Sequence, residues 1–344
     1  MKNKVHNIHL INTRILALCL LFSSVQTKAQ KSSTQHLAPS IAAPSVLLKN
    51  QKPTAHWIWD SGPDNPLNYY LLIRKTFELQ QIPTEAEAFI SAFAFADVYI
   101  NGKLVDRFPT NCDPEFQVYE KFDVSGYFKK GTNTISAMVY NFGTGMHHRI
   151  NGRGGFFFQA KLNLGENKVL ALNSDNTWRV KKADAWDNQT EMRSSDAHLI
   201  GFVEKYDARN MPEGWNESKF DHTKWQAARM LGIPPMAPWN KIVVVERPPL
   251  FHEIVYPVRH WFVGNKIVYD FGKEITGKPV IELFAKNAGA NFEMGTAERL
   301  LPDSTILYKE RVNYTDYYTA KKGNAELESC HLAGIPLLVG YRQR

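Results

Sequence analysis

The sequence predicts an all-β protein built as a sandwich, and three observations support this prediction. Aromatic residues, which suit half-buried pleated surfaces, make up 12% of the 344 residues. Apolar and polar residues alternate with a period of two along several segments, as in strands that bury one face. Asn, Gly and Pro turn signals separate these segments, and no long window shows a helical period of 3.6 residues.

Three segments show the alternation most clearly. Their apolar positions are Phe89, Phe93 and Phe95; Ile135, Ala137 and Val139; and Phe156, Phe158, Ala160, Leu162 and Leu164. Between two apolar runs, Asn101-Gly102 predicts a tight hairpin turn, because both residues tolerate positive φ. Further turn signals lie at 130–133 and 151–155. We also expect Asp97 or Asp123 to cap a turn through a side-chain oxygen.

A second, smaller β unit is predicted after residue 248. Proline becomes frequent at 234–238 and 247–249, which suits a crossing between domains. New alternating segments then follow at 267–271 and 280–284, punctuated by glycines. The predicted organisation is a first β domain over residues 54–248 and a second over residues 249–344.

The basic charge of the chain is concentrated at its start. The formal net charge is +7, with 41 basic and 34 acidic residues. Residues 1–29 hold four of the basic residues and no acidic one, contain an apolar run at 15–22, and end in Thr27-Lys28-Ala29. This pattern predicts a cleaved signal peptide and an exported protein, periplasmic or extracellular. Without that segment the net charge is +3, which gives no support to nucleic-acid binding.

The rest of the chain has no apolar run long enough to span a membrane, so no membrane span is predicted. A rival interpretation makes Cys19 a lipoprotein cysteine, but the bulky Leu18 before it disfavours this. Residues 30–53 are rich in Ser, Thr, Gln, Ala and Pro and predict a flexible linker. Cys112 and Cys330 remain as candidates for a disulfide in an oxidising compartment.

Several motifs resemble the non-catalytic front half of bacterial α-L-rhamnosidases. In the first domain they are Trp57-Ile58-Trp59, Ile73-Arg74-Lys75-Thr76-Phe77, Asp97-Val98-Tyr99-Ile100-Asn101-Gly102-Lys103, Asp123-Val124-Ser125, Lys130-Gly131-Thr132-Asn133 and Phe220-Asp221-His222-Thr223-Lys224-Trp225. In the second they are Tyr269-Asp270-Phe271-Gly272, Thr276-Gly277 and Gly295-Thr296-Ala297-Glu298-Arg299-Leu300. Across residues 55–325, the resemblance implies a galactose-binding-like jelly roll followed by a smaller concanavalin-like β-sandwich.

The resemblance also implies what the chain leaves out. In the family, an (α/α)6 barrel follows the concanavalin-like domain and carries the two carboxylates of an inverting glycosidase. Here the sequence departs from the family pattern after Glu326, so we expect a truncated or frameshifted family member. No Gly-x-Ser-x-Gly elbow, phosphate loop or His-Glu-x-x-His helix is present, and no catalytic residue is predicted. The expected function is accessory, with rhamnose-containing glycans as partners and no activity of the chain alone.

Sugar sites combine aromatic platforms with Asn, Asp, Arg and Gln side chains. Two segments have this composition, residues 141–153 and residues 184–188. The candidate carbohydrate-binding residues are Asn141, His147, His148, Arg153 and Trp186. Adjacent histidines on a strand point to opposite faces, so the His pair is not expected to share a metal. No cofactor is predicted, although the run Asp60-Ser61-Gly62-Pro63-Asp64-Asn65 offers oxygen ligands for a structural calcium.

Two alternatives remain open. The first alternative is an active hydrolase with an unrecognised site. The second is a secreted structural or adhesive sandwich without sugar affinity.

Overall fold

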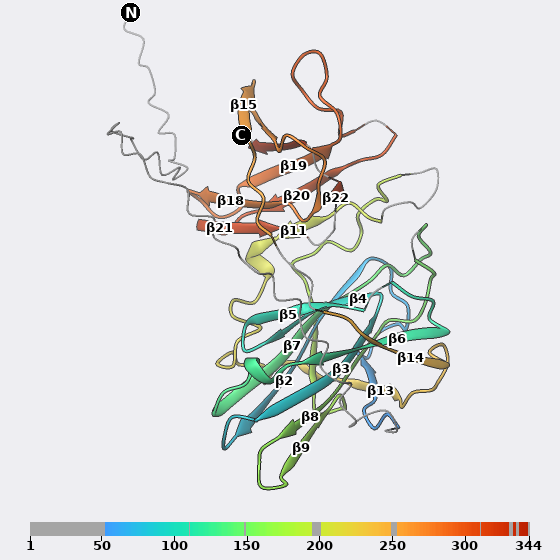
Figure 1. Ribbon diagram of the computed structural model, residues 1–344. Helices are drawn as coiled ribbons and strands as arrows, with labels where there is room; N and C mark the ends of the chain where they lie inside the picture. The colour runs from blue at the N-terminus through green and yellow to red at the C-terminus, as the bar shows by residue number, and fades with distance from the viewer. Residues whose placement is uncertain are drawn as a thin grey trace, which may run out of the picture. The chain divides into compact units, whose positions relative to one another are not determined.

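The structure is a computed structural model that describes residues 52–109, 111–147, 149–194, 201–248, 253–309, 311–329, 333–334 and 337–342 (Figure 1). The chain divides into two units at Lys52–Pro53, and the second unit, residues 53–344, holds all the strands below. The predicted signal peptide and most of the predicted linker lie outside the described residues.

Two antiparallel-rich sheets form the first sandwich. The seven-stranded sheet has the order β13-β1-β8-β3-β6-β14, with β9 beside β8, and the six-stranded sheet has the order β12-β10-β2-β7-β4-β5. The strands of the first sheet are β1 (Trp57–Trp59), β3 (Glu85–Phe93), β6 (Phe116–Asp123), β8 (Gly155–Asn163), β9 (Val169–Asn173), β13 (Arg229–Gly232) and β14 (Lys241–Glu246). Those of the second are β2 (Tyr69–Leu79), β4 (Phe95–Ile100), β5 (Lys103–Phe108), β7 (Gly131–Asn141), β10 (Arg179–Lys182) and β12 (Gln226–Ala227).

The all-β prediction is confirmed, and two of the three predicted apolar faces line the sandwich core. The alternating apolar residues of β7 and β8 are buried there, from Ile135 to Val139 and from Phe156 to Leu162. The face predicted for β3 is wrong. Its core-facing residues are Ala86, Ala88, Ile90 and Ala92, whereas the phenylalanines of this region pack in other clusters.

The reason for this error is that the large phenylalanines of β3 lie on the face opposite the sandwich core. On that face, Phe93 packs in a second cluster with residues that include Trp57 and Trp239, and Phe89 packs against that cluster. Glu85, Glu87 and Ser91 lie on the same face of the strand, so the phenylalanines do not mark the core side. Phe95 belongs to the next strand, β4, in the other sheet.

The predicted hairpin turn between β4 and β5 is confirmed. Asn101 and Gly102 have φ values of 53° and 81°, the left-handed region that this residue pair tolerates. Asp123 accepts hydrogen bonds from the backbone N–H and the hydroxyl of Ser125, at 2.9 and 2.6 Å, so its predicted capping role is confirmed. Asp97 makes a different interaction, because its two carboxylate oxygens accept from Arg107 at 2.6 and 2.8 Å.

A third sheet of six strands follows, in the order β11-β20-β19-β23-β16-β15 (orange to red in Figure 1, except β11). Its strands are β11 (Lys205–Asp207), β15 (Arg259–Val263), β16 (Lys266–Asp270), β19 (Asn291–Ala297), β20 (Thr315–Thr319) and β23 (Leu337–Arg342). Two strand pairs complete the fold: β17 (Thr276–Gly277) with β22 (Ala333–Gly334), and β18 (Val280–Ala285) with β21 (Gly323–Glu328). The described helices are the 3-10 turns η1 (Ser125–Tyr127) and η2 (Ala208–Asn210).

Two parallel pairings join segments that are far apart in the sequence. β14 pairs with β6 from Lys241–Phe116 to Glu246–Lys121. β11 pairs with β20 in the third sheet, although its residues, Lys205–Asp207, lie within the range 54–248 predicted for the first domain. The domain boundary at 248–249 stays a prediction.

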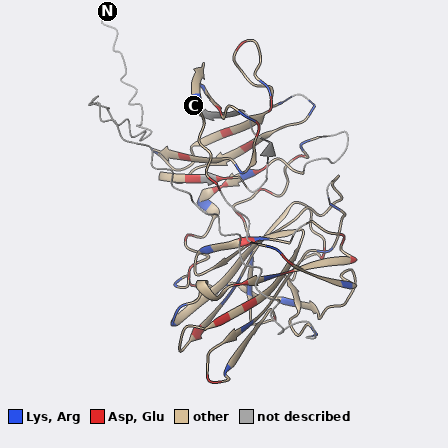
Figure 2. Ribbon diagram, viewed as in Figure 1, with Lys and Arg blue, Asp and Glu red and all other residues tan. Residues whose placement is uncertain are grey.

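Basic and acidic residues are interspersed over the strands and loops (Figure 2). Within the described residues, no helix has the length and apolar character needed to cross a membrane. Cys112 is a free cysteine, and its predicted partner Cys330 lies outside the described residues.

Candidate functional site

Two loops meet at the end of the first sandwich through asparagine side chains. Asn141, at the end of β7, donates its Nδ2 to the Asn65 Oδ1 at 2.9 Å and to the Pro66 carbonyl at 3.2 Å. Asn65 in turn donates to the Asn151 Oδ1 at 2.9 Å and to the Gly143 carbonyl at 3.3 Å. We call the polar residues gathered here the rim cluster: Asp64, Asn65, Asn141, Asn151, Arg153 and Arg229.

The glycines of the 151–155 segment allow the backbone of this loop to pack closely against the sandwich. A Cβ on Gly152 would lie 2.6 Å from the Phe93 ring, and one on Gly154 would lie 2.5 Å from the Trp59 ring. A Cβ on Gly155 would meet Trp239 at 2.7 Å. The backbone therefore lies directly against buried aromatic rings, which only glycine permits. Arg153 projects from this backbone between two of the contacts.

Two guanidinium groups converge on one carboxylate. The Asp64 Oδ1 accepts hydrogen bonds from the Arg229 Nη2 at 2.6 Å and from the Arg153 Nη2 at 3.2 Å. The hydrogen bond from Arg229, followed by the charge of Arg153, holds the pKa of Asp64 below its usual range despite partial desolvation. Asp64 therefore stays ionised at neutral pH, and the rim cluster presents N–H donors beside a carboxylate acceptor.

Apolar side chains lie next to these polar groups in the sequence. Leu67 is 51% exposed and follows Pro66, and Ile150 is 55% exposed and precedes Asn151. A Cβ on Gly143 would lie 2.5 Å from the Leu67 Cα, so the two loops are in close contact at this point. His147 is exposed in the same loop, and His148 lies outside the described residues.

The segment proposed to hold calcium already uses its carboxylates. Asp60 accepts from the Gly62 N–H at 2.9 Å and from the Tyr69 hydroxyl at 2.5 Å, and burial together with this bond raises the pKa of Tyr69. Asp64 is held by the two arginines. Among the described side chains, no group of three or more His, Cys, Asp or Glu residues is placed to hold a metal ion. Calcium binding by this segment stays a prediction.

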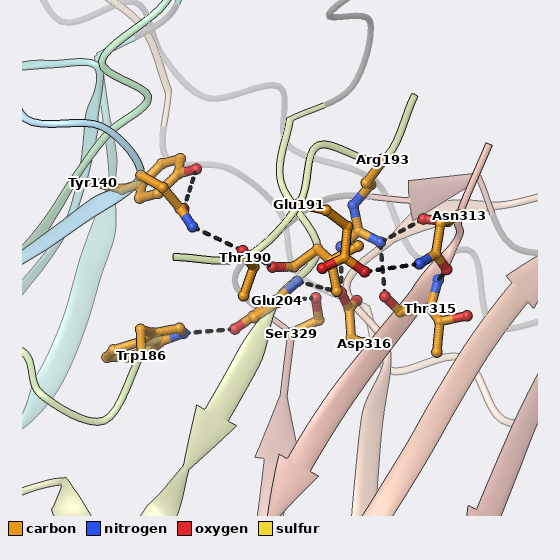
Figure 3. A network of polar contacts seen from close by, with 12 residues as sticks. Tyr140, Trp186, Thr190, Glu191, Arg193, Glu204, Asn313, Thr315, Asp316 and Ser329 are labelled. Carbon is orange, nitrogen blue, oxygen red and sulfur yellow. Dashed lines mark hydrogen bonds and ion pairs between the residues drawn. The ribbon is translucent and has the colours of Figure 1, made fainter. Parts of the chain in front are cut away.

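Trp186 packs against protein on one face, and its ring contacts and hydrogen bond among the described residues are with residues outside the rim cluster. Its ring stacks on Tyr70 with centroids 4.6 Å apart and planes 7° apart, and Tyr206 lies 4.7 Å from it. Its Nε1 donates to the Glu204 Oε1 at 2.8 Å (Figure 3). The structure thus places Trp186 in a packed aromatic row, and its role as a sugar platform stays a prediction.

Glu204 belongs to a buried polar network that sequence reasoning did not find (Figure 3). Its backbone N–H donates to the Asp316 Oδ1 at 3.0 Å, and its Oε2 accepts from the Ser329 hydroxyl at 3.1 Å. Arg193, 7% exposed, forms an ion pair with Asp316 and donates to the carbonyls of Asn313 and Thr315 at 3.1 Å. A lone Arg or Glu in a polar stretch carries no sequence signal of such pairing.

The same segment is fastened to the first sandwich. Tyr140 donates its hydroxyl to the Asn68 Oδ1 at 3.0 Å, and Asn68 donates to the Thr190 Oγ1 at 3.0 Å. Residues 186–194 and 201–207 therefore link the second sheet, through Asn68 and Tyr140, to the third sheet, through Asp316 and β20. This network is a structural link, and its groups are engaged with one another.

Comparisons with known proteins agree with this architecture. Residues 81–249 match the family model of the α-L-rhamnosidase N-terminal domain. An α-L-rhamnosidase of Formosa agariphila is 26% identical over 316 residues, which cover 81% of this chain and 31% of that protein. One from an Alteromonas species is 24% identical over 331 residues, again 81% of this chain and 31% of the relative.

Solved structures show the same fold. The α-L-rhamnosidase of Dictyoglumus thermophilum has a TM-score of 0.68 and 22% identity, covering 84% of this chain and 34% of that one. The α-L-rhamnosidase of Streptomyces avermitilis in complex with L-rhamnose has a TM-score of 0.64 and 21% identity, covering 80% of this chain and 27% of that one. The chain therefore carries an α-L-rhamnosidase N-terminal domain over residues 81–249, and it spans 31% of the length of the two curated relatives it matches.

Proposed function

We propose that this chain is a carbohydrate-binding accessory part of an α-L-rhamnosidase family protein and that the rim cluster is its sugar site. The observation that supports this most is that two polar groups lie on neighbouring residues. Arg153 and Arg229 both donate to Asp64, and the next residue, Asn65, is hydrogen-bonded to Asn151. Except for Arg229, which begins β13, these groups lie on loops at the end of a sandwich, where binding residues are commonly carried by a rigid scaffold.

The chemistry of the cluster suits a sugar. Guanidinium N–H groups can donate to adjacent hydroxyl oxygens as a pair, and the Asp64 carboxylate can accept from a hydroxyl proton. The amides of Asn65 and Asn151 supply both a donor and an acceptor. Leu67 and Ile150 offer exposed apolar surface for the C–H face of a sugar ring.

The ligand class is proposed from the relatives. They are α-L-rhamnosidases, and one solved relative was crystallised with L-rhamnose. We therefore propose rhamnose-containing glycans as the ligands of this chain. In L-rhamnose, C6 is a methyl group. This apolar group matches the exposed apolar side chains of Leu67 and Ile150, which neighbour rim-cluster residues in the sequence.

Calorimetric titration with L-rhamnose and rhamnosyl oligosaccharides tests the proposal. Arg153→Ala removes a charge-assisted donor, and we expect affinity to fall about tenfold to a hundredfold, as for hydrogen bonds to charged groups worth ~1.5–3 kcal/mol. Arg209→Ala is the matched control, because Arg209 is an exposed arginine paired with Asp207 outside the rim cluster. Thermal unfolding of both variants shows whether the fold is retained.

Two outcomes would count against the proposal. Absence of binding by the intact chain would reject it outright, and equal affinity of the Arg153 and Arg209 variants would remove Arg153 from the site. Turnover of a chromogenic rhamnoside by the purified chain would replace the binding role with a hydrolytic one.

Export forms part of the same proposal and is supported by the pattern of residues 1–29. Sequencing the N-terminus of the protein produced in its native host tests it. A mature protein that starts at Gln30 in the extracytoplasmic fraction is expected, and an uncleaved protein in the cytoplasm would contradict it.

A further inference from the structure

The sequence contains two Asn-Gly dipeptides, and the structure holds their asparagine side chains very differently. At Asn101, the Nδ2 donates to the Tyr127 carbonyl at 2.9 Å and to the Asn133 Oδ1 at 2.8 Å. The Asn101 Oδ1 accepts from the Thr134 backbone N–H at 3.0 Å. Three hydrogen bonds therefore fix this amide inside the hairpin.

Asn151, in the rim cluster, is exposed and much less constrained. Among the described residues, its side chain makes one hydrogen bond, in which its Oδ1 accepts from the Asn65 Nδ2 at 2.9 Å. The N–H of Gly152 makes no backbone hydrogen bond within the described part of the chain. Gly152 also has no side chain to hinder an approach to the Asn151 amide carbon.

We infer that Asn151 is a site of spontaneous deamidation and that Asn101 is protected from it. The backbone nitrogen of Gly152 attacks the Cγ of Asn151, and its proton leaves with the side-chain nitrogen as ammonia. The N–Cγ bond that forms closes a five-membered succinimide as the Cγ–Nδ2 bond breaks. Water then opens the ring at either carbonyl, which gives aspartate or isoaspartate. The net reaction consumes one water, turns an amide into a carboxylate, and involves no oxidant.

The modification places a new charge inside the rim cluster. Asn151 is bonded to Asn65, whose neighbour Asp64 already pairs with Arg153 and Arg229. A second carboxylate there competes with Asp64 for the guanidinium groups, and isoaspartate also lengthens the backbone just before Arg153. An effect on sugar affinity rests on the proposed function, whereas the modification itself does not.

Peptide mapping by mass spectrometry tests the inference. The full chain is incubated in mildly alkaline buffer at physiological temperature, and the acid form is quantified at both asparagines over time. We expect Asn151 to convert about thirtyfold faster than Asn101, the factor that two additional hydrogen bonds of ordinary strength represent. In urea-unfolded protein, where these bonds are lost, the two rates should become similar.

Two variants sharpen the test without touching Gly152, whose contact with Phe93 leaves no room for a Cβ. Asn151→Gln should abolish the conversion at this position, since its longer side chain cannot close the five-membered ring. Asn65→Ala should speed it, because it removes the one hydrogen bond to the Asn151 amide. Equal conversion of both asparagines in the folded protein, or no conversion of Asn151 when unfolded protein reacts, would overturn the inference. Because mapping needs no ligand, a failed sugar titration would leave this result unaffected.

Discussion

Arg247 reaches the first sandwich from the end of β14 and meets two buried carboxylates. Its Nη1 lies 2.9 Å from the Asp106 Oδ2, and its Nη2 lies 2.8 Å from the Glu120 Oε2. Asp106 is 1% exposed and Glu120 is fully buried. The guanidinium also lies over the Phe122 ring at 5.1 Å, so it is enclosed by apolar surface on that side. We expect Arg247→Leu to be among the most destabilising substitutions outside the glycines.

The size of the expected loss in unfolding free energy depends on the carboxylates of Asp106 and Glu120, which remain when Arg247 is removed. Removing one partner of a buried ion pair costs about 3–5 kcal/mol, because the remaining charge is neither solvated nor compensated. Here one substitution takes a guanidinium from two carboxylates, while Asp106 still accepts from the Arg107 backbone N–H at 2.8 Å, so the loss should lie within that range. Arg209→Leu is the matched control, because Arg209 pairs with Asp207 at the exposed surface, where solvent screens the interaction and its loss changes stability little.

Urea unfolding at neutral pH, followed by tryptophan fluorescence, measures both variants. We expect the Arg247→Leu midpoint to fall sharply with little change in slope, and the Arg209→Leu midpoint to stay near that of the native chain. Adding Asp106→Asn and Glu120→Gln to Arg247→Leu should recover part of the loss, since these two buried side chains then carry no charge. A loss below about 1 kcal/mol for Arg247→Leu would refute the reasoning.

Two further predictions concern close packing and acid stability. Gly154→Ala should destabilise the fold by about 1–3 kcal/mol, because its Cβ would collide with the buried Trp59 ring. Gly145→Ala in the same loop has open space around it and should change stability by less than about 0.5 kcal/mol. Equal effects of the two substitutions in thermal unfolding would contradict this. Asp270 accepts from the Gly272 N–H at 2.7 Å and from Arg259 at 2.7 Å, and these bonds hold its pKa below the usual range. Its stabilisation is therefore present above the unfolded pKa of about 3.9 and lost as pH falls through the lower folded pKa, so Asp270→Asn should flatten the acid limb of the stability curve; an unchanged limb would argue against this role.

Local patterns predicted the parts of this fold that local physics decides. The Asn101-Gly102 turn follows from the φ values that these two residues tolerate, and the alternation of β7 and β8 follows from the apolar face that each strand turns to the sandwich core. The motifs also identified the family. The structure brings Asn141 and Arg153 into the rim cluster, and their role in sugar binding stays a prediction.

What the sequence concealed depends on contacts between distant residues. Asp64 and Arg229 are far apart in the chain and meet only because β1 pairs with β13. The 151–155 glycines signal a turn in sequence, yet their contacts are with Phe93, Trp59 and Trp239. Trp186 looked like an exposed platform because its neighbours are polar, whereas Tyr70 covers one face of its ring. No period or motif encodes such pairings.

Amide NMR spectra of the isotopically labelled chain show directly whether the rim cluster binds a sugar. The side-chain NH2 groups of Asn65, Asn141 and Asn151 provide probes inside the cluster, and the Trp186 indole N–H provides one outside it. Titration with a rhamnosyl oligosaccharide should shift the asparagine signals and leave the Trp186 signal in place. Shifts confined to Trp186 and its neighbours, or no saturable shift at all, would contradict the account.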